Sequence, residues 1–215
     1  QDKLTEESEI IKKIESIPNV DACFITHAHI DHSGLLPILV KKRKIKNIYS
    51  TPVTKELSKH LFYDMMKIQS INGNENKQHF FDERDLSDTF IYWETKDENN
   101  IIKINDDIEV IFFYNAHIIG SVSVYISTPE GNFLFSGDIG TKQQKLMNPE
   151  INIPNETDYL FLETTYGNKI HDPFDRERLH TVIEETLKND GKVLIPVFAV
   201  GRLQEVLHEI GRKEY

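Results

Sequence analysis

The sequence is poor in cysteine and has no long apolar run. Its single cysteine, Cys23, excludes a disulfide within the chain, so a reducing, cytoplasmic setting is expected. No apolar stretch approaches the roughly 20 residues that a membrane-spanning helix needs, and we expect no role in a membrane. Residues 1–9 are polar and acidic, which does not fit the apolar core of a signal peptide.

Positive charge is also in short supply. The chain carries 25 lysine and arginine residues against 35 aspartate and glutamate residues, for a formal net charge of −10. This balance argues against a surface coated with positive charge for nucleic-acid binding. It leaves open a nuclease whose bound cations supply the positive field at the active site. The basic run at 41–44 is expected to be a solvated helix end.

The chain has ordinary globular composition, with 39% hydrophobic residues among 215. Apolar spacing predicts helices over 5–17 and 35–40, the second capped by Ser33, another from Thr51 and Pro52 onwards, and a short one within 80–90. Strands are predicted at 20–26, 45–50, 101–104, 108–114, 121–127, 133–135 and 159–162, and a polar loop at 71–79. The fold class is therefore α/β or α+β with a largely β core.

The most informative segment runs from His27 to His32, with the sequence His-Ala-His-Ile-Asp-His. Imidazole and carboxylate groups together suit zinc and similar divalent ions. In an extended segment, His27 and His29 point to the same side, and Asp31 and His32 follow on a turn. A helical zinc site would instead space its histidines four residues apart. The pattern therefore predicts a strand-end loop that holds two metals side by side.

Two more candidate ligands follow predicted strands. His117 comes directly after the segment 111–116, which begins with an apolar run. Asp138 lies in the sequence Ser-Gly-Asp-Ile-Gly, after the predicted strand at 133–135. Each signal is weak alone, and a single histidine is more often a satisfied structural residue. Beside the first motif they complete a site, because strand ends hold functional residues rigidly.

We expect His27, His29 and His117 to hold a first metal, Asp31 and His32 to hold a second, and Asp138 to bridge them. Such a pair of metals, about 3.5–4 Å apart, produces a nucleophilic hydroxide at neutral pH and binds both oxygens of a phosphodiester displacement. Asp31 and Asp138 would lie close to the nucleophile and orient it. A separate proton donor is needed for the leaving oxygen.

Glu163 ends the strand at 159–162 and begins the sequence Glu-Thr-Thr-Tyr-Gly. From its position, two interpretations stay open: a carboxylate that caps the following turn, or a site residue. Arg202 follows Gly201 at a predicted helix start, where it can meet a phosphate or serve domain packing. Ser33 and Arg202 are our candidate substrate contacts.

These residues together make the chain resemble the metallo-β-lactamase-fold hydrolases. In particular it resembles their β-CASP RNA-processing branch, which includes the bacterial J-type ribonucleases and the cleavage-and-polyadenylation endonuclease. The motif H-x-H-x-D-H-S-G stands at 27–34, the later histidine is His117, and Asp138 lies in S-G-D-x-G. The branch-specific E-[ST]-T-Y-G motif begins at Glu163, and residues 192–205 resemble the opening of a β-CASP domain.

The resemblance implies an αββα sandwich that holds two zinc ions, with Mn²⁺ or Fe²⁺ as alternatives. It implies hydrolysis of RNA or, less often, single-stranded DNA, and it makes Glu163 a catalytic residue that orients a histidine acting on the leaving group. Residues 1–172 would form the metallo-β-lactamase domain without its N-terminal strands and C-terminal part. Residues 173–215 would begin the β-CASP domain.

The chain also departs from the family pattern. Nothing at 1–20 matches the family's first strands, and two later histidines, one of them a ligand of the second metal, are absent. We therefore expect exposed apolar strand faces. We also expect activity to require the missing segments or a partner chain that supplies them.

Two rival functions remain. A small-molecule metallo-hydrolase, such as a thioesterase or lactonase, would share the metal motif and fit the acidic charge, but such enzymes lack Glu163 and the segment 192–205. A non-catalytic scaffold subunit of an RNA-processing complex would have lost metal ligands, whereas every ligand within the covered stretch is present here.

Overall fold

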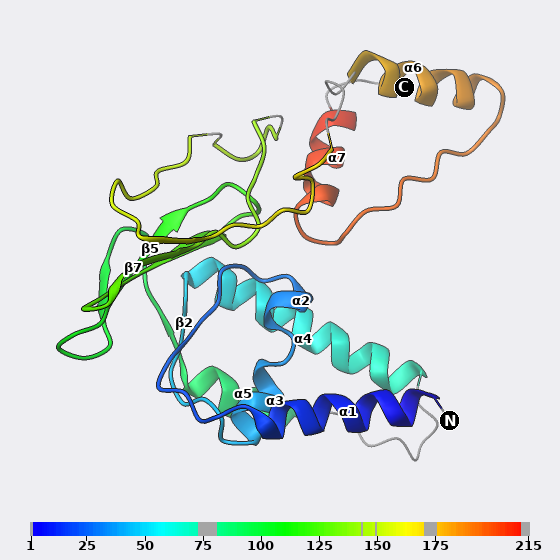
Figure 1. Ribbon diagram of the computed structural model, residues 1–215. Coiled ribbons are helices and arrows are strands. Elements are labelled where there is room, and N and C mark those ends of the chain that lie inside the picture. Colours follow the sequence, from blue (N-terminus) through cyan, green and yellow to red (C-terminus); the bar gives the residue numbers. More distant parts are fainter. Residues whose placement is uncertain (1, 73–80, 143, 149, 170–175, 212–215) are drawn as a thin grey trace.

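In the computed structural model, two β-sheets pack face to face and helices cover the outer side of one of them (Figure 1). The structure describes residues 2–72, 81–142, 144–148, 150–169 and 176–211. The predicted domain boundary at 172/173 and most of the predicted loop at 71–79 lie outside these residues. None of the described helices is both long and apolar enough to cross a bilayer.

The first sheet is parallel and has three strands in the order β1 (Cys23–Phe24), β2 (Ile48–Ser50) and β3 (Trp93–Thr95). Parallel neighbours need crossover connections, and helices supply them here. The connections contain α2 (Ile30–Ser33) and α3 (Leu36–Lys41) before β2, then α4 (Pro52–Asn72) and α5 (Glu83–Ile91) before β3. The N-terminal helix α1 (Asp2–Ser16) packs with α3, α4 and α5 on the outer face.

The core of this helical layer is aromatic and aliphatic. Phe62 of α4 is fully buried among the rings of Phe81, Phe90 and Trp93, with centroids 6.2–6.4 Å apart. Ile14 from α1 and Leu86 from α5 join the same cluster, which reaches the motif loop through Ile25 and Ile30. Burial of this apolar surface fixes the loop 27–33 on the sheet.

The second sheet has five strands in sequence order: β4 (Ile101–Lys103), β5 (Glu109–Tyr114), β6 (Val122–Thr128), β7 (Gly131–Phe135) and β8 (Tyr159–Phe161). The first four are antiparallel neighbours, and β8 pairs with β7 in parallel. Alternate residues of β5 and β6, such as Val110, Phe112 and Val124, pack against Phe24 and Tyr49 of the first sheet. The site loops 115–121 and 136–142 leave this sheet at one end.

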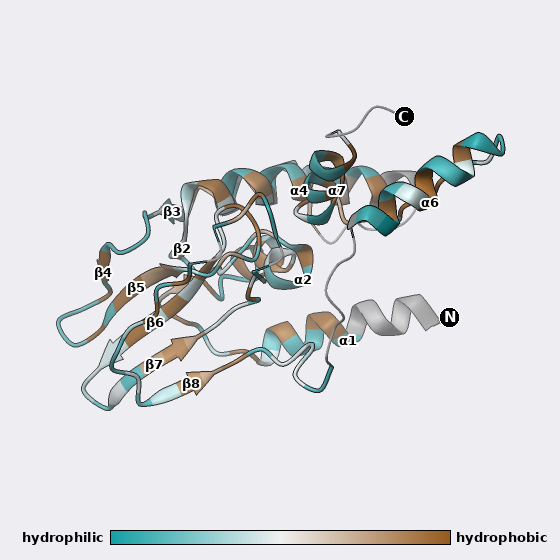
Figure 2. Ribbon diagram, turned by 90° about the horizontal axis from the view of Figure 1, so that it is seen from above, coloured by the Kyte–Doolittle hydropathy of each residue, from teal (hydrophilic) through white to brown (hydrophobic). Residues whose placement is uncertain are grey.

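Strands β7 and β8 are rich in apolar residues (Figure 2), and several of these side chains are exposed. Phe135 stacks on Phe161 with ring centroids 4.4 Å apart, and Phe133 stacks on Tyr159 at 4.8 Å. Residues 159–162 are each more than half exposed. The expected exposure of apolar strand faces is thus confirmed, and the described layers are helix, sheet and sheet.

The remaining helices, α6 (Arg176–Lys188) and α7 (Arg202–Ile210), stand to one side of the sandwich (Figure 1). Irregular chain over 191–199 connects them and contains the exposed side chains of Leu194 and Phe198. They belong to the stretch for which a second domain was predicted.

Three local predictions were wrong. Ser33 is not a helix cap: it ends α2, and Leu35 precedes α3. Strand β1 is shorter than the predicted 20–26, and β3 was missed. Strand β3 was missed because the apolar run from Ile91 to Trp93 is too short to show a strand period, so it could not be distinguished from the end of the preceding helix.

Candidate metal centre

His27 lies at the bottom of the site and is completely buried. Its Nδ1 lies 3.1 Å from the Thr26 hydroxyl, and its Nε2 has no hydrogen-bond partner among the described residues. The pKa of His27 is lowered to about 2, chiefly by burial and to a smaller extent by the neighbouring imidazoles of His32, His117 and His29. The ring is therefore neutral at physiological pH, and its buried Nε2 offers a lone pair to a cation when the ring proton is on Nδ1.

His29 and His117 meet beside it. Their Nδ1 and Nε2 atoms are 3.2 Å apart. One ligand atom from each of His27, His29, His117 and Asp138 lies within 4.8 Å of all the others. Burial lowers the pKa of His117, and the nearby Asp138 carboxylate opposes this effect only in part. The four groups are thus close enough to share one ion.

Asp138 presents its two oxygens to different histidines. Oδ2 lies 3.5 Å from Nε2 of His117 and 3.8 Å from Nε2 of His27, while Oδ1 lies 3.4 Å from Nε2 of His32. The preceding Gly137 has a positive φ of 57°, and a Cβ there would lie 2.9 Å from the Cβ of Thr26. Glycine therefore lets the chain turn after β7 and bring the carboxylate over the histidines.

Asp31 and His32 form the outer part of the site. The Asp31 side chain is 79% exposed, and its Oδ2 lies 3.5 Å from Nε2 of His32. His32 thus lies between two carboxylates, those of Asp31 and Asp138. Asp31 is the most exposed of the candidate ligands, whereas the first group contains the completely buried His27 and three half-buried residues.

A buried asparagine holds the His117 loop. Asn115 donates from Nδ2 to the Ser136 carbonyl at 3.0 Å, and its Oδ1 accepts the Ser121 hydroxyl at 2.6 Å and the His117 N–H at 3.3 Å. Ala116 has a positive φ of 63°, a conformation that glycine adopts more easily. Asn115 therefore links the ends of β5 and β7, and with them His117 and Asp138.

Glu163 lies beside the same loop. Its Oε1 accepts the N–H of Ile139, next to Asp138, at 3.2 Å, and its Oε2 accepts the N–H of Thr165 at 3.0 Å. Burial raises the pKa of the Glu163 carboxyl, but the hydrogen bonds from Thr165 and Ile139 outweigh it, so the pKa is lowered on balance. Glu163 thus caps its own turn, as one of the two interpretations predicted, and its hydrogen bond to Ile139 also braces the Asp138 loop.

The two candidate substrate contacts differ in their surroundings. Ser33 is only 1% exposed, and its hydroxyl donates to the carbonyls of Ala28 and His29 at 3.0 and 3.1 Å. This burial argues against the expected substrate contact, because the side chain supports the motif loop instead. Arg202 is exposed at the start of α7.

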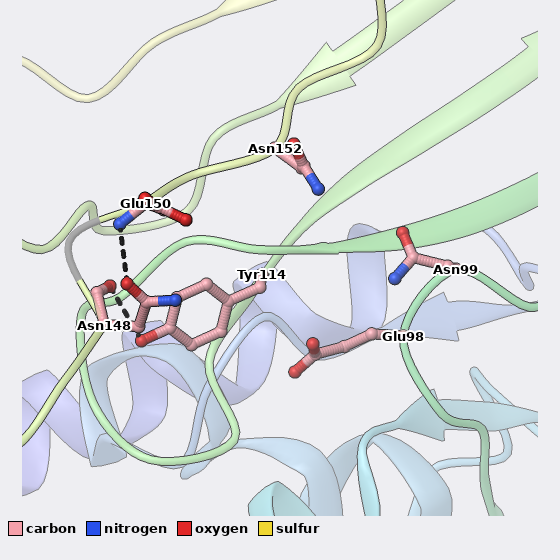
Figure 3. Close-up of a pocket in the computed structure, with 6 residues that line it drawn as sticks. All are labelled: Glu98, Asn99, Tyr114, Asn148, Glu150 and Asn152. Atoms are coloured by element: carbon pink, nitrogen blue, oxygen red, sulfur yellow. Dashed lines mark hydrogen bonds between the residues drawn. The ribbon is translucent and has the colours of Figure 1, made fainter.

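A polar cavity of about 410 Å³ opens near the end of β5 and contains none of the predicted site residues. Figure 3 shows its lining, which consists of Glu98, Asn99, Tyr114, Asn148, Glu150 and Asn152. The Tyr114 hydroxyl donates to the Asn148 carbonyl at 3.1 Å. Two carboxylates and no cationic side chain make this lining unfavourable for a phosphate group.

Sequence reasoning missed two contacts of the C-terminal part, one at the centre and one beside it. The carbonyl of Val200 lies 3.2 Å from Nε2 of His29, and the Glu205 carboxylate accepts the N–H groups of Lys145 and Leu146 at 2.8–3.1 Å. No sequence pattern marks a main-chain carbonyl, and Glu205 looks like an ordinary surface residue of a helix.

The donor set fits a divalent metal centre. It combines imidazole and carboxylate groups, the types that hold zinc and neighbouring ions. Among the described residues, the buried Nε2 of His27 has no hydrogen-bond partner, which is unfavourable unless a cation binds there. The 3.2 Å distance between Nδ1 of His29 and Nε2 of His117 is likewise unfavourable unless a cation or a proton lies between these two nitrogens.

The sequence comparisons agree with this geometry. Residues 4–196 match the family model described as the metallo-beta-lactamase superfamily. The chain is 36% identical over 195 residues to the transcription termination factor FttA of Thermococcus kodakarensis, covering 87% of this chain and 30% of that protein. It is 32% identical over 194 residues to the endoribonuclease ysh1 of Schizosaccharomyces pombe, covering 89% of this chain and 25% of that protein.

A third relative is the RNase J-like protein of Methanocaldococcus jannaschii, 33% identical over 192 residues, which cover 87% of this chain and 42% of that protein. The chain thus spans well under half the length of each of these relatives. Their names agree with the RNA-processing branch predicted from Glu163 and the segment 192–205.

Proposed function

Because the chain belongs to the metallo-beta-lactamase superfamily, we propose that it is a metal-dependent nuclease that hydrolyses the phosphodiester bonds of RNA. The observation that carries this proposal is the placement of Asp138, whose two oxygens face separate histidine groups at 3.4–3.5 Å. One carboxylate shared by two sets of ligands suits a two-metal centre.

In this proposal, His27, His29 and His117 hold a first ion, Asp31 and His32 hold a second, and Asp138 bridges both. Zinc suits the mixture of imidazole and carboxylate, and Mn²⁺ or Fe²⁺ are the alternatives. Two such ions would acidify a water molecule and neutralise the phosphate. We further propose that segments present in the longer relatives, or a partner chain, complete the exposed second group.

The residues of the chain then have distinct roles. Asp31 and Asp138 accept hydrogen bonds from the attacking water and orient it toward the phosphorus. The Glu163 carboxylate accepts the N–H of Ile139 at 3.2 Å and so keeps the Asp138 loop in place. We further propose that Glu163 orients the group that protonates the leaving oxygen. Arg202 is exposed and can bind a substrate phosphate.

RNA is proposed as the substrate because two of the relatives are named as an endoribonuclease and an RNase J-like protein. The net charge of −10 does not conflict with this, because cations at the site supply the attraction for phosphate. We propose the cytoplasm as its location on the basis of the single, free Cys23.

A substrate panel tests the proposal. The chain, extended by the segments that its longer relatives carry and loaded with zinc, is incubated with end-labelled single-stranded RNA, with DNA of the same sequence, and with a thioester and a lactone. We expect cleavage of RNA that a chelator abolishes and added zinc restores. Turnover of the thioester or lactone with intact RNA would favour a small-molecule hydrolase, and zinc binding without turnover of any substrate would favour a scaffold.

A further inference from the structure

A main-chain carbonyl from the C-terminal part of the chain reaches into the candidate metal centre. Val200 O lies 3.2 Å from Nε2 of His29, although the two residues are 171 positions apart. A carbonyl oxygen accepts hydrogen bonds and cannot donate them, so Nε2 of His29 must carry the proton. Nδ1 of His29 is then unprotonated, and it is this atom that lies 3.2 Å from Nε2 of His117.

The half-buried peptide that supplies this carbonyl packs closely against the His117 loop. The next residue, Gly201, has a φ of 94°, and a Cβ there would lie 2.7 Å from Cγ2 of Ile118, the neighbour of His117. On the other side, the ring of Phe198 lies 6.3 Å from the ring of His29. Glycine therefore lets residues 200–201 approach both metal-binding loops at once.

Side chains of α7 hold the same segment in place. Gln204 accepts the Gly201 N–H at 2.7 Å and donates to the Ala199 carbonyl at 2.9 Å. Glu205 accepts the N–H groups of Lys145 and Leu146, which belong to the chain that follows Asp138. Residues 198–205 thus contact His29 and the His117 loop, and Glu205 contacts the chain a few residues beyond the Asp138 loop.

We propose that residues 198–205 form a positioning clamp that fixes His29 in the tautomer whose Nδ1 faces the metal site. The proposal rests on the proposed function, since it concerns the same centre. Partners of this kind orient the ligand, and their loss typically weakens metal binding by about 10–100-fold. The clamp would make metal affinity depend on the C-terminal part of the chain.

The test combines nuclear magnetic resonance with zinc titration. In metal-free protein, the ¹⁵N and ¹H signals of the imidazoles identify the tautomer of His29, and we expect a protonated Nε2. Zinc affinity is measured by competition with a chromogenic chelator. Gly201→Ala should weaken binding of the first zinc ion by about 10–100-fold and remove the Nε2–H signal of His29.

Glu205→Ala serves as a second variant, because it releases the clamp without adding backbone strain. It should change zinc affinity in the same direction, by less. Gly211→Ala, at the far end of α7, and Glu185→Ala, exposed on α6, are the matched controls, and both should bind zinc like the unaltered protein.

A protonated Nδ1 on His29 in the unaltered protein would overturn the clamp, as would native-like zinc affinity in both folded variants. If Gly201→Ala does not fold, the tautomer and Glu205→Ala decide the matter. Failure of the unaltered protein to bind zinc would count against the proposed function instead. The tautomer measured in metal-free protein would still decide whether the clamp exists.

Discussion

At the scale of single residues, the site depends on His27 and Asp138. His27 is buried with its Nε2 facing Asp138 at 3.8 Å, and the two oxygens of Asp138 point to two histidine groups. The group that contains the buried His27 and the group that contains the exposed Asp31 should therefore hold their ions with different strength. Exchange of the outer ion is expected to be the faster, because Asp31 is 79% exposed.

His32→Ala should separate the two groups. We expect this variant to keep the first zinc ion, because His27, His29, His117 and Asp138 remain, and to lose the second. Elemental analysis after gel filtration measures the metal content. His60→Ala, an exposed histidine on α4, is the control and should match the unaltered protein. Loss of both ions in His32→Ala would contradict the division into two groups.

Acid should destabilise the metal-free protein through His27. Its pKa falls from 6.5 to about 2 on folding, chiefly because the ring is buried. Below pH 6.5, His27 is protonated in the unfolded chain but stays neutral in the folded chain. The stabilising contribution is therefore complete above pH 6.5 and is lost as the pH falls, by up to about 1.4 kcal/mol per pH unit for one proton.

Urea unfolding at pH 7, 6 and 5 in the presence of a chelator measures this dependence. His27→Gln should have a shallower loss of unfolding free energy between pH 7 and 5 than the unaltered protein, whereas His60→Gln should have the same loss. Equal slopes for all three proteins would show that His27 is not buried in its neutral form.

Glu163→Gln should separate catalysis from metal binding. The substitution replaces one carboxylate oxygen by an N–H donor, which then faces a backbone N–H from Ile139 or Thr165. We expect normal zinc content and RNA cleavage reduced by about 10–100-fold. Glu130→Gln, in the exposed turn between β6 and β7, is the control. Full cleavage by Glu163→Gln would leave this residue with only its capping role.

At the scale of elements, the helical layer depends on well-made helix ends. The N-cap of α5 is Asp82, whose carboxylate accepts the N–H groups of Arg84 and Asp85 at 2.9 Å. Asp85 in turn accepts the N–H of Asp82 at 3.0 Å and pairs with Lys41 of α3. This capping box fixes α5 under β3, at the edge of the parallel sheet.

Asp82→Ala should lower the free energy of unfolding by about 1 kcal/mol, within a range of about 0.5–2 kcal/mol for lost caps. Asp88→Ala, exposed in the same helix, should change it by less than about 0.5 kcal/mol. Chemical denaturation followed by circular dichroism gives both values. A loss of the same size in the two variants would mean that the cap contributes nothing of its own.

The elements that could be predicted from sequence are those with a clear period or a clear end. The strand β6 alternates around Val122, Val124 and Ile126, and α4 begins at Pro52, directly after Thr51. Strand β3 was missed because its three residues have no measurable period. The end of α2 was missed because Ser33 uses its hydroxyl on the preceding carbonyls instead of a following N–H.

At the scale of the whole molecule, the site joins parts of the chain that are far apart in sequence. The candidate ligands themselves could be predicted, because histidine and aspartate at strand ends carry a recognisable chemistry. The contacts of Val200 and Glu205 could not, since they depend on how the C-terminal segment folds back over the site. The exposed apolar face of β7 and β8 agrees with the much greater length of the relatives.

The decisive measurement counts the metals and follows RNA in the same samples. The unaltered chain and Asp138→Ala, each extended by the segments that the longer relatives carry, are loaded with zinc, freed of excess ion, analysed for metal and incubated with labelled single-stranded RNA. We predict about two zinc ions per chain and cleavage of RNA in the unaltered protein, and loss of both the bridged pair and cleavage in the variant. Cleavage of RNA that persists in metal-depleted Asp138→Ala would contradict a metal centre built on this aspartate.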